Sequence, residues 1–338
     1  MSSAFKQAYR PCSRQYGFTL VEIMIAMVLG LLLTSGVIQV FGSVRQTNRV
    51  HEETARMQEN GRMALEVLGR DIRMADFWGC ASTIANVTNN LNSANAGFID
   101  FGAGGIDGIE GGLNPDTLVL RGGFDVGLNV EPPYGPQASA NISVAAGNDL
   151  AQSDILFVSD CTQADIFQIS NANPGSTGTL VHNTGSTTTP GNYNVTNPGC
   201  PGANAHCLSK IYGADATVFR VQEIAYSIGV GSEGEPALFR NGVEFLDGIE
   251  DLQVLYGEDL DAPGTSGSGV ADYYVPADQV VDMGSVISIR VSVVMRSYND
   301  NLTGGINQSY DVLGAPRTAA DERLRQVFTS TVAVRNRI

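Results

Sequence analysis

The first feature of the chain is a continuous apolar run from Phe18 to about Phe41, in which Glu22 is the only charged residue. A helix needs roughly 20 apolar residues to cross the hydrocarbon core of a bilayer. The run therefore predicts a membrane-spanning helix over 18–41. A carboxylate inside such a span is costly, so Glu22 is either a functional residue or a residue of the headgroup layer near the helix end.

A second pattern predicts that the helix continues beyond the membrane, over 42–78. Apolar or small residues recur there every three or four positions, and polar residues fill much of the remaining surface. This spacing is typical of an amphipathic helix that buries one stripe against a sheet. Trp78 is predicted to pack at the helix end. The predicted stripe consists of Met57, Gly61, Ala64, Leu65, Leu68, Ile72 and Ala75.

The remaining chain, 79–338, changes to short β-branched or alternating runs separated by polar stretches. Because no long helix lies between these runs, they predict a mostly antiparallel β-rich domain. Asn241-Gly242 predicts a type I′ hairpin turn. Three long Asn/Ser/Thr/Gly-rich stretches, 85–114, 171–206 and 259–271, are predicted to be surface loops. The predicted strands are 117–122, 154–160, 165–170, 216–229, 237–242, 286–297 and 327–336.

Residues 1–17 contain three basic residues and no acidic residue, as in a cytoplasmic targeting leader. The small residue Gly17 stands before the apolar core, whereas an ordinary secretory signal has its cleavage site after the core. The sequence GFTLVE followed by an apolar helix resembles the class III signal of type IV prepilins. The resemblance implies that prepilin peptidase cuts between Gly17 and Phe18 and that Phe18 is then N-methylated. It also implies that Glu22 pairs with the amino terminus of a neighbouring subunit during assembly.

Four later segments resemble the PilW family of type IV pilus minor pilins: RDIRMADFWGC, VSDCTQADIFQIS, DGIEDLQVLYGEDLD and VFTSTVAVRNR. This resemblance implies an α+β, pilin-like fold, in which a long N-terminal helix packs on a mostly antiparallel sheet with long loops. It implies a cleaved leader over 1–17 and, as partners, other minor pilins, the major pilin and a large tip adhesin. The expected location is the inner membrane with a periplasmic domain, and after assembly the pilus near its tip.

The net charge of the chain bears on which class of molecule it can bind. The formal net charge is −15, and removal of the three cations in the leader makes it −18. A sequence-independent nucleic-acid binder needs Lys and Arg to displace counterions, so this acidity argues against that class. Arg45, Arg49 and Arg56 follow the span, so the count of basic residues on its two sides is a tie and does not set its orientation.

Four of the five cysteines remain after the leader, which contains Cys12, is removed: Cys80, Cys161, Cys200 and Cys207. An even number in an exported domain predicts two disulfides, for which three connectivities are possible. The closeness of Cys200 and Cys207 in sequence favours a local pair, which leaves Cys80 with Cys161. A metal site made of Cys200, His206 and Cys207 is the alternative, but its spacing does not match that of common zinc sites.

Catalytic chemistry is not indicated by the sequence. His51, His182 and His206 have no evident nucleophile as a partner, so the chain is predicted not to be an enzyme. The glycine-rich segment 102–112 lacks the Lys-Ser/Thr of a phosphate loop and is predicted to be flexible. Glu258, Asp259 and Asp261 could contribute to a calcium site, although Ala262 and Pro263 interrupt the ligand pattern. No other cofactor or metal is predicted.

Three functions fit these features. The first is a minor pilin that joins a tip or initiation complex and primes pilus assembly, in support of twitching motility and surface adhesion. The second is a J-like minor pseudopilin of a type II secretion system, which supports protein export. The third is a membrane-anchored hydrolase or sugar-binding protein, for which the sequence contains no visible site. The PilW-like segments favour the pilus over the secretion system.

Overall fold

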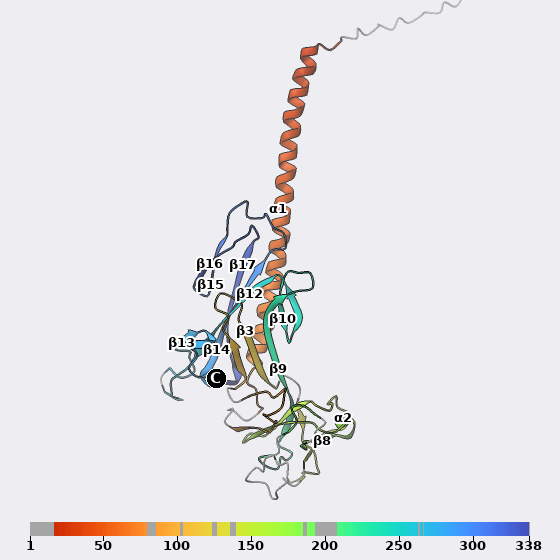
Figure 1. Cartoon of the computed structure of the whole chain (residues 1–338), viewed down its shortest axis with the longest axis vertical. Helices are drawn as coiled ribbons and strands as arrows, with labels where there is room; N and C mark the ends of the chain where they lie inside the picture. The colour runs from red at the N-terminus through yellow and green to blue at the C-terminus, as the bar shows by residue number, and fades with distance from the viewer. Residues whose placement is uncertain are drawn as a thin grey trace, which may run out of the picture. The chain divides into compact units, whose positions relative to one another are not determined.

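The computed structural model describes residues 17–79, 86–101, 104–123, 127–135, 140–184, 188–192, 208–262, 264–265 and 267–337. The chain divides into two compact units, Met1–Glu52 and Glu53–Ile338. One long helix, α1 (Leu20–Met74), contributes to both units (Figure 1). The predicted helix of 18–78 is therefore present, with ends a few residues inside the expected ones.

In the first unit, the apolar side chains of α1 are exposed from Leu20 to Val44. Among the described residues, α1 is the one helix long and apolar enough to cross a membrane. Full exposure of so many Leu, Ile, Val and Met side chains is unfavourable in water and favourable in lipid. The first part of α1 therefore has the surface of a membrane-spanning helix.

In the second unit, the rest of α1 buries one stripe. Met57, Ala64, Leu68 and Ile72 are at most 2% exposed, and Gly61 is also buried. These residues form one apolar core with side chains from two β-sheets. The predicted stripe is confirmed, and its polar counterpart at Glu59, Arg62, Glu66, Arg70 and Arg73 is exposed.

The larger sheet has nine strands, and the long strand β9 pairs with four of them. Its main path runs β1-β7-β6-β9-β10-β11, while β2 joins through β3 and both β3 and β4 pair with β9. All pairs are antiparallel except β1 with β7. Its strands are β1 (Val87–Asn89), β2 (Ile106–Ile109), β3 (Thr117–Gly123), β4 (Leu128–Asn129), β6 (Ile155–Ser159), β7 (Ala164–Gln168), β9 (Thr217–Val230), β10 (Pro236–Arg240) and β11 (Val243–Asp247).

The second sheet is antiparallel, with the order β13-β12-β14-β17. Two further strand pairs lie outside both sheets, β15 with β16 and β5 with β8. The remaining strands and α-helix are β5 (Asn141–Ser143), α2 (Pro174–Thr177), β8 (Thr179–Val181), β12 (Ile249–Glu258), β13 (Tyr273–Val275), β14 (Val286–Arg296), β15 (Ser309–Val312), β16 (Ala315–Thr318) and β17 (Arg325–Ala333); the described 3-10 helices are η2 (Ala277–Gln279), η3 (Met283–Ser285) and η4 (Arg335–Arg337).

A buried carboxylate connects the two sheets beside β3. The backbone N–H of Asp116 donates to Leu252 O over 2.8 Å, and its carboxylate accepts from the N–H groups of Gly111 and Val254, each at 2.8 Å. Burial raises the pKa of Asp116 to about 6, despite these two hydrogen bonds. The junction between β3 and β12 therefore contains an acid whose pKa is raised by burial.

The described residues 127–216 and 86–101 form a lobe, which is built mainly on the chain between β3 and β9. The lobe has a core of its own, which includes Leu156, Phe167 and Leu180. A second core joins the lobe to the end of α1, because Phe77 and Trp78 pack there with Phe157.

Most strand predictions are confirmed, including the hairpin, in which Asn241 and Gly242 have φ values of 53° and 74°. The predicted loops were wrong in part. Strands β1 and β2 lie within 85–114, and α2 and β8 lie within 171–206. The glycine-rich segment that was predicted to be flexible contains β2, whose Ile106 is fully buried. Neighbouring strands determine these short elements, which have little local signal of their own.

Candidate functional site

The start of α1 brings the predicted assembly residue into a local hydrogen-bonded ring. Glu22 Oε2 accepts from the backbone N–H of Thr19 at 2.9 Å and from its hydroxyl at 3.0 Å. In return, the N–H of Glu22 donates to Thr19 Oγ1 at 3.3 Å. This arrangement is a capping box, in which the residue before the helix and the third helical residue satisfy each other's backbone N–H groups. The sequence T-L-V-E before an apolar run carried that signal, and sequence reasoning missed it.

The capping box uses only one of the two carboxylate oxygens. Within the described residues Glu22 Oε1 accepts no hydrogen bond, and the whole side chain is exposed. A carboxylate can accept at both oxygens at once. One oxygen of Glu22 therefore holds its own helix start, while the other is available to a donor from outside the chain.

The predicted cleavage point lies immediately before this box. Gly17, Phe18 and Thr19 precede the helix and are exposed. A Cβ built on Gly17 would meet nothing within 4 Å, so the described part of the chain does not itself require a glycine there. Residues 1–16 of the predicted leader lie outside the described residues, and cleavage between Gly17 and Phe18 stays a prediction.

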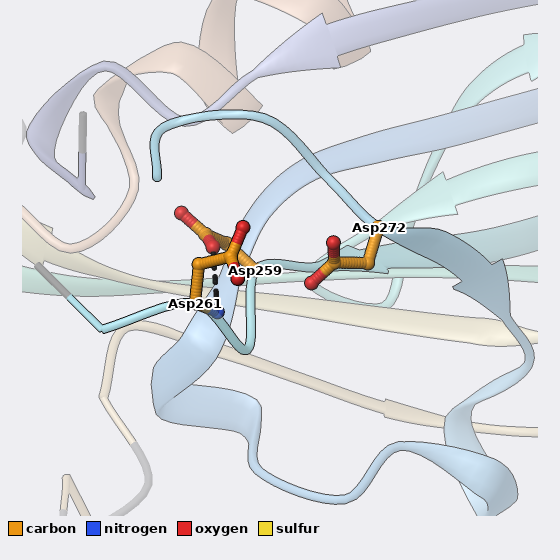
Figure 2. A group of neighbouring side chains, drawn as sticks. All are labelled: Asp259, Asp261 and Asp272. Carbon is orange, nitrogen blue, oxygen red and sulfur yellow. Dashed lines mark hydrogen bonds between the residues drawn. The ribbon is translucent and has the colours of Figure 1, made fainter. Parts of the chain in front are cut away.

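The structure also gathers three carboxylates in the loop between β12 and β13. Asp259, Asp261 and Asp272 each offer an oxygen, and these oxygens lie within 4.8 Å of one another (Figure 2). Three backbone N–H groups donate to the group: Asp261 and Gly269 to Asp259, and Leu260 to Asp272. Oxygen ligands at this spacing suit a hard cation such as calcium. Calcium binding stays a prediction, which calorimetry of the protein with calcium would test.

The membership of this acidic group differs from the expected one. Glu258 is fully buried, and its Oε1 accepts from the N–H groups of Val281 and Asp282 at 3.0 and 2.9 Å. Glu258 is not among the carboxylates whose oxygens lie within 4.8 Å of one another, which are those of Asp259, Asp261 and Asp272. Asp272 takes the place that was predicted for Glu258. Sequence reasoning missed it because Asp259 and Asp272 meet only through the pairing of β12 with β13.

A buried carboxylate, Glu53, holds α1 at the point where the helix enters the second unit. It accepts from Tyr298 N at 3.0 Å, from Asn299 Nδ2 at 2.6 Å and from Arg56 Nη2 at 2.8 Å. Burial acts to raise the pKa of Glu53, but the Arg56 and backbone hydrogen bonds outweigh it and hold the pKa below its ordinary value. The guanidinium of Arg56 also lies 3.6 Å from the centre of the Tyr298 ring.

The other end of α1 is held by polar contacts from the final residues of the chain. Asn336 Nδ2 donates to Ala75 O at 2.8 Å, and Arg337 Nε pairs with Asp76 Oδ2 at 2.5 Å. Asp76 Oδ1 accepts from the indole N–H of Trp78 at 2.7 Å. Groups that donate to the last helical carbonyls satisfy acceptors that the helix leaves open, and a cation there complements the helix dipole.

Cys161 is the one predicted disulfide cysteine within the described residues, and it is disulfide-bonded. Its partner is not among the described residues. Cys80, Cys200 and Cys207 all lie outside them, so the connectivity of the disulfides stays a prediction. His206 of the alternative metal site also lies outside. His182 is buried against the ring of Phe167, with centroids 5.3 Å apart, and Trp78 packs in the core as predicted.

Two family models match the chain, one at each end. The model described as "Prokaryotic N-terminal methylation motif" matches residues 12–38, which include Gly17, Phe18 and Glu22. The model described as "Type IV Pilus-assembly protein W" matches residues 225–336, from the end of β9 to the end of the second sheet. No curated protein and no solved structure matches the chain. The lobe lies outside both matched regions.

The methylation motif implies processing by prepilin peptidase and association with other pilins. The long apolar helix and the motif fit anchoring in the inner membrane, together with pilus assembly. The mostly antiparallel body agrees with a pilin-like α+β fold. Taken together, these features and the two matches show that the chain is similar to PilW-like minor pilins of the type IV pilus.

Proposed function

We propose that this chain joins an initiation complex of minor pilins near the pilus tip and primes polymerisation of the major pilin. The observation that carries the proposal is the lobe, which has its own core and adds the described residues of 86–101 and 127–216 to the PilW-like body. A repeating shaft subunit must pack closely with its neighbours on all sides. A lobe of this size suits a low-copy position, where it can face a partner.

The presence of Glu22 indicates where in the initiation complex the subunit lies. In the assembly that the resemblance implies, the acid neutralises the positive amino terminus of the subunit added just before it. Such a pair of unlike charges in low dielectric attracts strongly and relieves the cost of burying each charge alone. The first subunit of a filament has no use for the acid, so we place this protein below a tip subunit that lacks one. The complex also includes a large non-pilin adhesin at the tip.

Processing precedes assembly in this proposal. Cleavage between Gly17 and Phe18 and N-methylation of Phe18 leave Thr19 and Glu22 in the mature chain, so the capping box survives. Intact-mass analysis of membrane material should find a chain that begins at Phe18 and carries one methyl group. A chain that still begins at Met1 in cells with functional pili would contradict the proposal.

Gene deletion tests the priming role. The deletion strain should lose surface pili and twitching while the amount of processed major pilin in the membrane stays normal, and the wild-type gene should restore both. Electron microscopy, a twitching assay and immunoblotting measure the three outcomes. Normal piliation together with the loss of secreted enzymes would instead support a type II secretion pseudopilin, which the PilW match does not favour.

The protein is proposed to act by assembly and not by catalysis. Similarity to pilins suggests a structural protein. Before assembly the body is proposed to lie in the periplasm, and afterwards on the cell surface. Its acidity suits an exported surface and disfavours nucleic acid as a partner.

A further inference from the structure

We propose that Arg45 and Arg49 form a binding surface for phospholipid phosphates in the membrane leaflet that lies at the C-terminal end of the apolar run. The proposal concerns the lone, membrane-inserted subunit and does not depend on its place in a pilus. It assigns a partner to the two arginines that follow the span, which neither filament pairing by Glu22 nor the packing of the body uses.

The first step is the charge of this part of α1. Between Glu22 and Glu52 the chain contains no acidic residue, and Arg45, Arg49 and His51 are its only titratable groups. Both arginines are exposed, and within the described residues neither forms an ion pair or a hydrogen bond. A strongly acidic chain thus has a pair of exposed arginines without an ion-pair partner among the described residues.

The second step is position along the helix. The twenty residues from Glu22 to Phe41 span about 30 Å at 1.5 Å per residue, which is the thickness of the hydrocarbon core. Arg45 then lies about 6 Å beyond the core and Arg49 about 12 Å beyond it. The headgroup layer extends about 5–8 Å beyond the core, so phosphates lie at the depth of Arg45, and Arg49 lies a few ångströms farther from the membrane.

The third step is direction. Residues four apart lie on the same face of an α-helix, so both guanidinium groups can engage one region of the headgroup layer. Side chains of a helix tilt toward its N-terminus, which for this pair is toward the membrane. Arg49 can therefore reach back to the phosphate layer, and the planar guanidinium donates two parallel hydrogen bonds to a phosphate.

Arg56, on the same helix, has partners within the chain. It pairs with Glu53 at 2.8 Å and lies over the Tyr298 ring. Arg62, by contrast, is exposed and, within the described residues, forms no ion pair or hydrogen bond, but it lies seventeen residues after Arg45 and too far along the helix to reach the headgroups. Arg62 is therefore a matched control for an exposed arginine on α1 without a phosphate partner.

The test measures the proximity of arginine Cζ to lipid phosphorus directly. The mature full chain, labelled with ¹³C at the guanidinium carbon, is reconstituted in phosphatidylethanolamine bilayers with and without phosphatidylglycerol. Solid-state NMR should show that ³¹P dephases a fraction of the arginine Cζ signal in both lipids, since both contain the phosphate. The R45Q/R49Q double variant should lose this dephased fraction, and Arg62→Gln should retain it.

Three outcomes would overturn the proposal. One is the absence of ³¹P dephasing in the wild-type chain, and another is dephasing that persists in the R45Q/R49Q variant. The third is an equal loss of the dephased fraction in Arg62→Gln, because the contact would then not be specific to Arg45 and Arg49. Circular dichroism of each variant verifies that the helix is intact.

Discussion

At the scale of single residues, the two carboxylate oxygens of Glu22 have different hydrogen-bonding roles. Oε2 closes the helix start, and Oε1 is available outside the chain. The acid therefore has hydrogen-bond partners even in a lone subunit, whereas the sequence predicted only its pairing with a neighbouring subunit. This division separates two roles, helix capping and intersubunit pairing, which different substitutions can remove one at a time.

Glu22→Gln should separate the two roles. The amide oxygen of glutamine can still accept from Thr19, but the charge is lost. Since the proposed intersubunit pair depends on charge, we expect incorporation into sheared pili to fall at least about tenfold. Immunoblotting of sheared pili against the membrane fraction measures this ratio.

The matched control is Thr19→Val, which removes the hydroxyl of the capping box and keeps both the charge and the side-chain shape. It should remain in the pilus fraction. If Thr19→Val and Glu22→Gln lower incorporation equally, capping and not pairing is the role of the acid.

Asp116 predicts a pH dependence of folding. Its pKa of about 6 in the folded chain lies above the value of about 3.9 for a free aspartate. The folded state thus holds the proton more tightly, so the stabilisation is full below pH 4 and is lost as the pH rises through 6. The expected loss is on the order of 2–3 kcal/mol in the free energy of unfolding.

Urea unfolding of the detergent-solubilised mature chain between pH 4 and pH 7 measures this slope. Asp116→Asn cannot titrate and should flatten it, although the amide gives up one backbone hydrogen bond and lowers stability overall. The exposed Asp278→Asn is the control and should leave the slope unchanged. An unchanged slope in Asp116→Asn would refute the assignment.

At the scale of elements, α1 meets β17 through two glycines with different surroundings. A Cβ on Gly61 would lie 2.8 Å from Phe328 Cζ and closer still to two other atoms of the ring. A Cβ on Gly69 would lie 3.6 Å from Val332 Cγ2, which is ordinary contact. Gly61 therefore permits close packing of helix and strand, and Gly69 is not needed for it.

Alanine at these two positions should act in opposite directions. Gly61→Ala gains up to about 1 kcal/mol of helix propensity but overpacks the interface at a cost of about 1–3 kcal/mol, so we expect net destabilisation. Gly69→Ala gains the propensity without the clash and should be neutral or stabilising. Denaturant midpoints of the two variants measure the difference, and equal midpoints would contradict the packing assignment.

The elements that sequence reasoning found are those with a long local pattern. The stripe from Met57 to Ala75 and the Asn241-Gly242 hairpin depend on residues a few positions apart, so periodicity and turn chemistry were sufficient. Strands β1, β2 and β8 are three or four residues long and lie in Asn/Gly-rich sequence, and only pairing with distant strands determines them. The meeting of Asp259 with Asp272 likewise depends on strand register.

At the scale of the whole chain, the lobe and the end of α1 share a core. The ring of Phe157 lies 5.5 Å from Trp78 and stacks on Phe219 at 4.9 Å. Ser159 Oγ donates to the carbonyl of Trp78 at 2.8 Å. Loosening this core should therefore loosen both the lobe and the residues that follow the helix.

Phe157→Ala tests this coupling. We expect it to lower the free energy of unfolding by about 3–5 kcal/mol and to speed amide hydrogen exchange in residues 74–78 as well as in the lobe. Phe167→Ala removes an equally buried ring from the separate core of the lobe and should speed exchange in the lobe alone. Equal exchange at 74–78 in the two variants would show that the lobe and the helix end are independent.

The part of α1 in the second unit is fastened at both of its ends, and this has a mechanical consequence. Glu53 secures the first turn of the helix in the body, Asn336 and Arg337 secure the last, and the buried stripe lies between them. A force along the helix axis must shear all of these contacts together, because no single contact can open first. Force across the axis would instead break them in turn. The body should therefore resist tension along α1 far better than force that peels it from the helix. Tension along α1 is the direction of load that a filament subunit experiences.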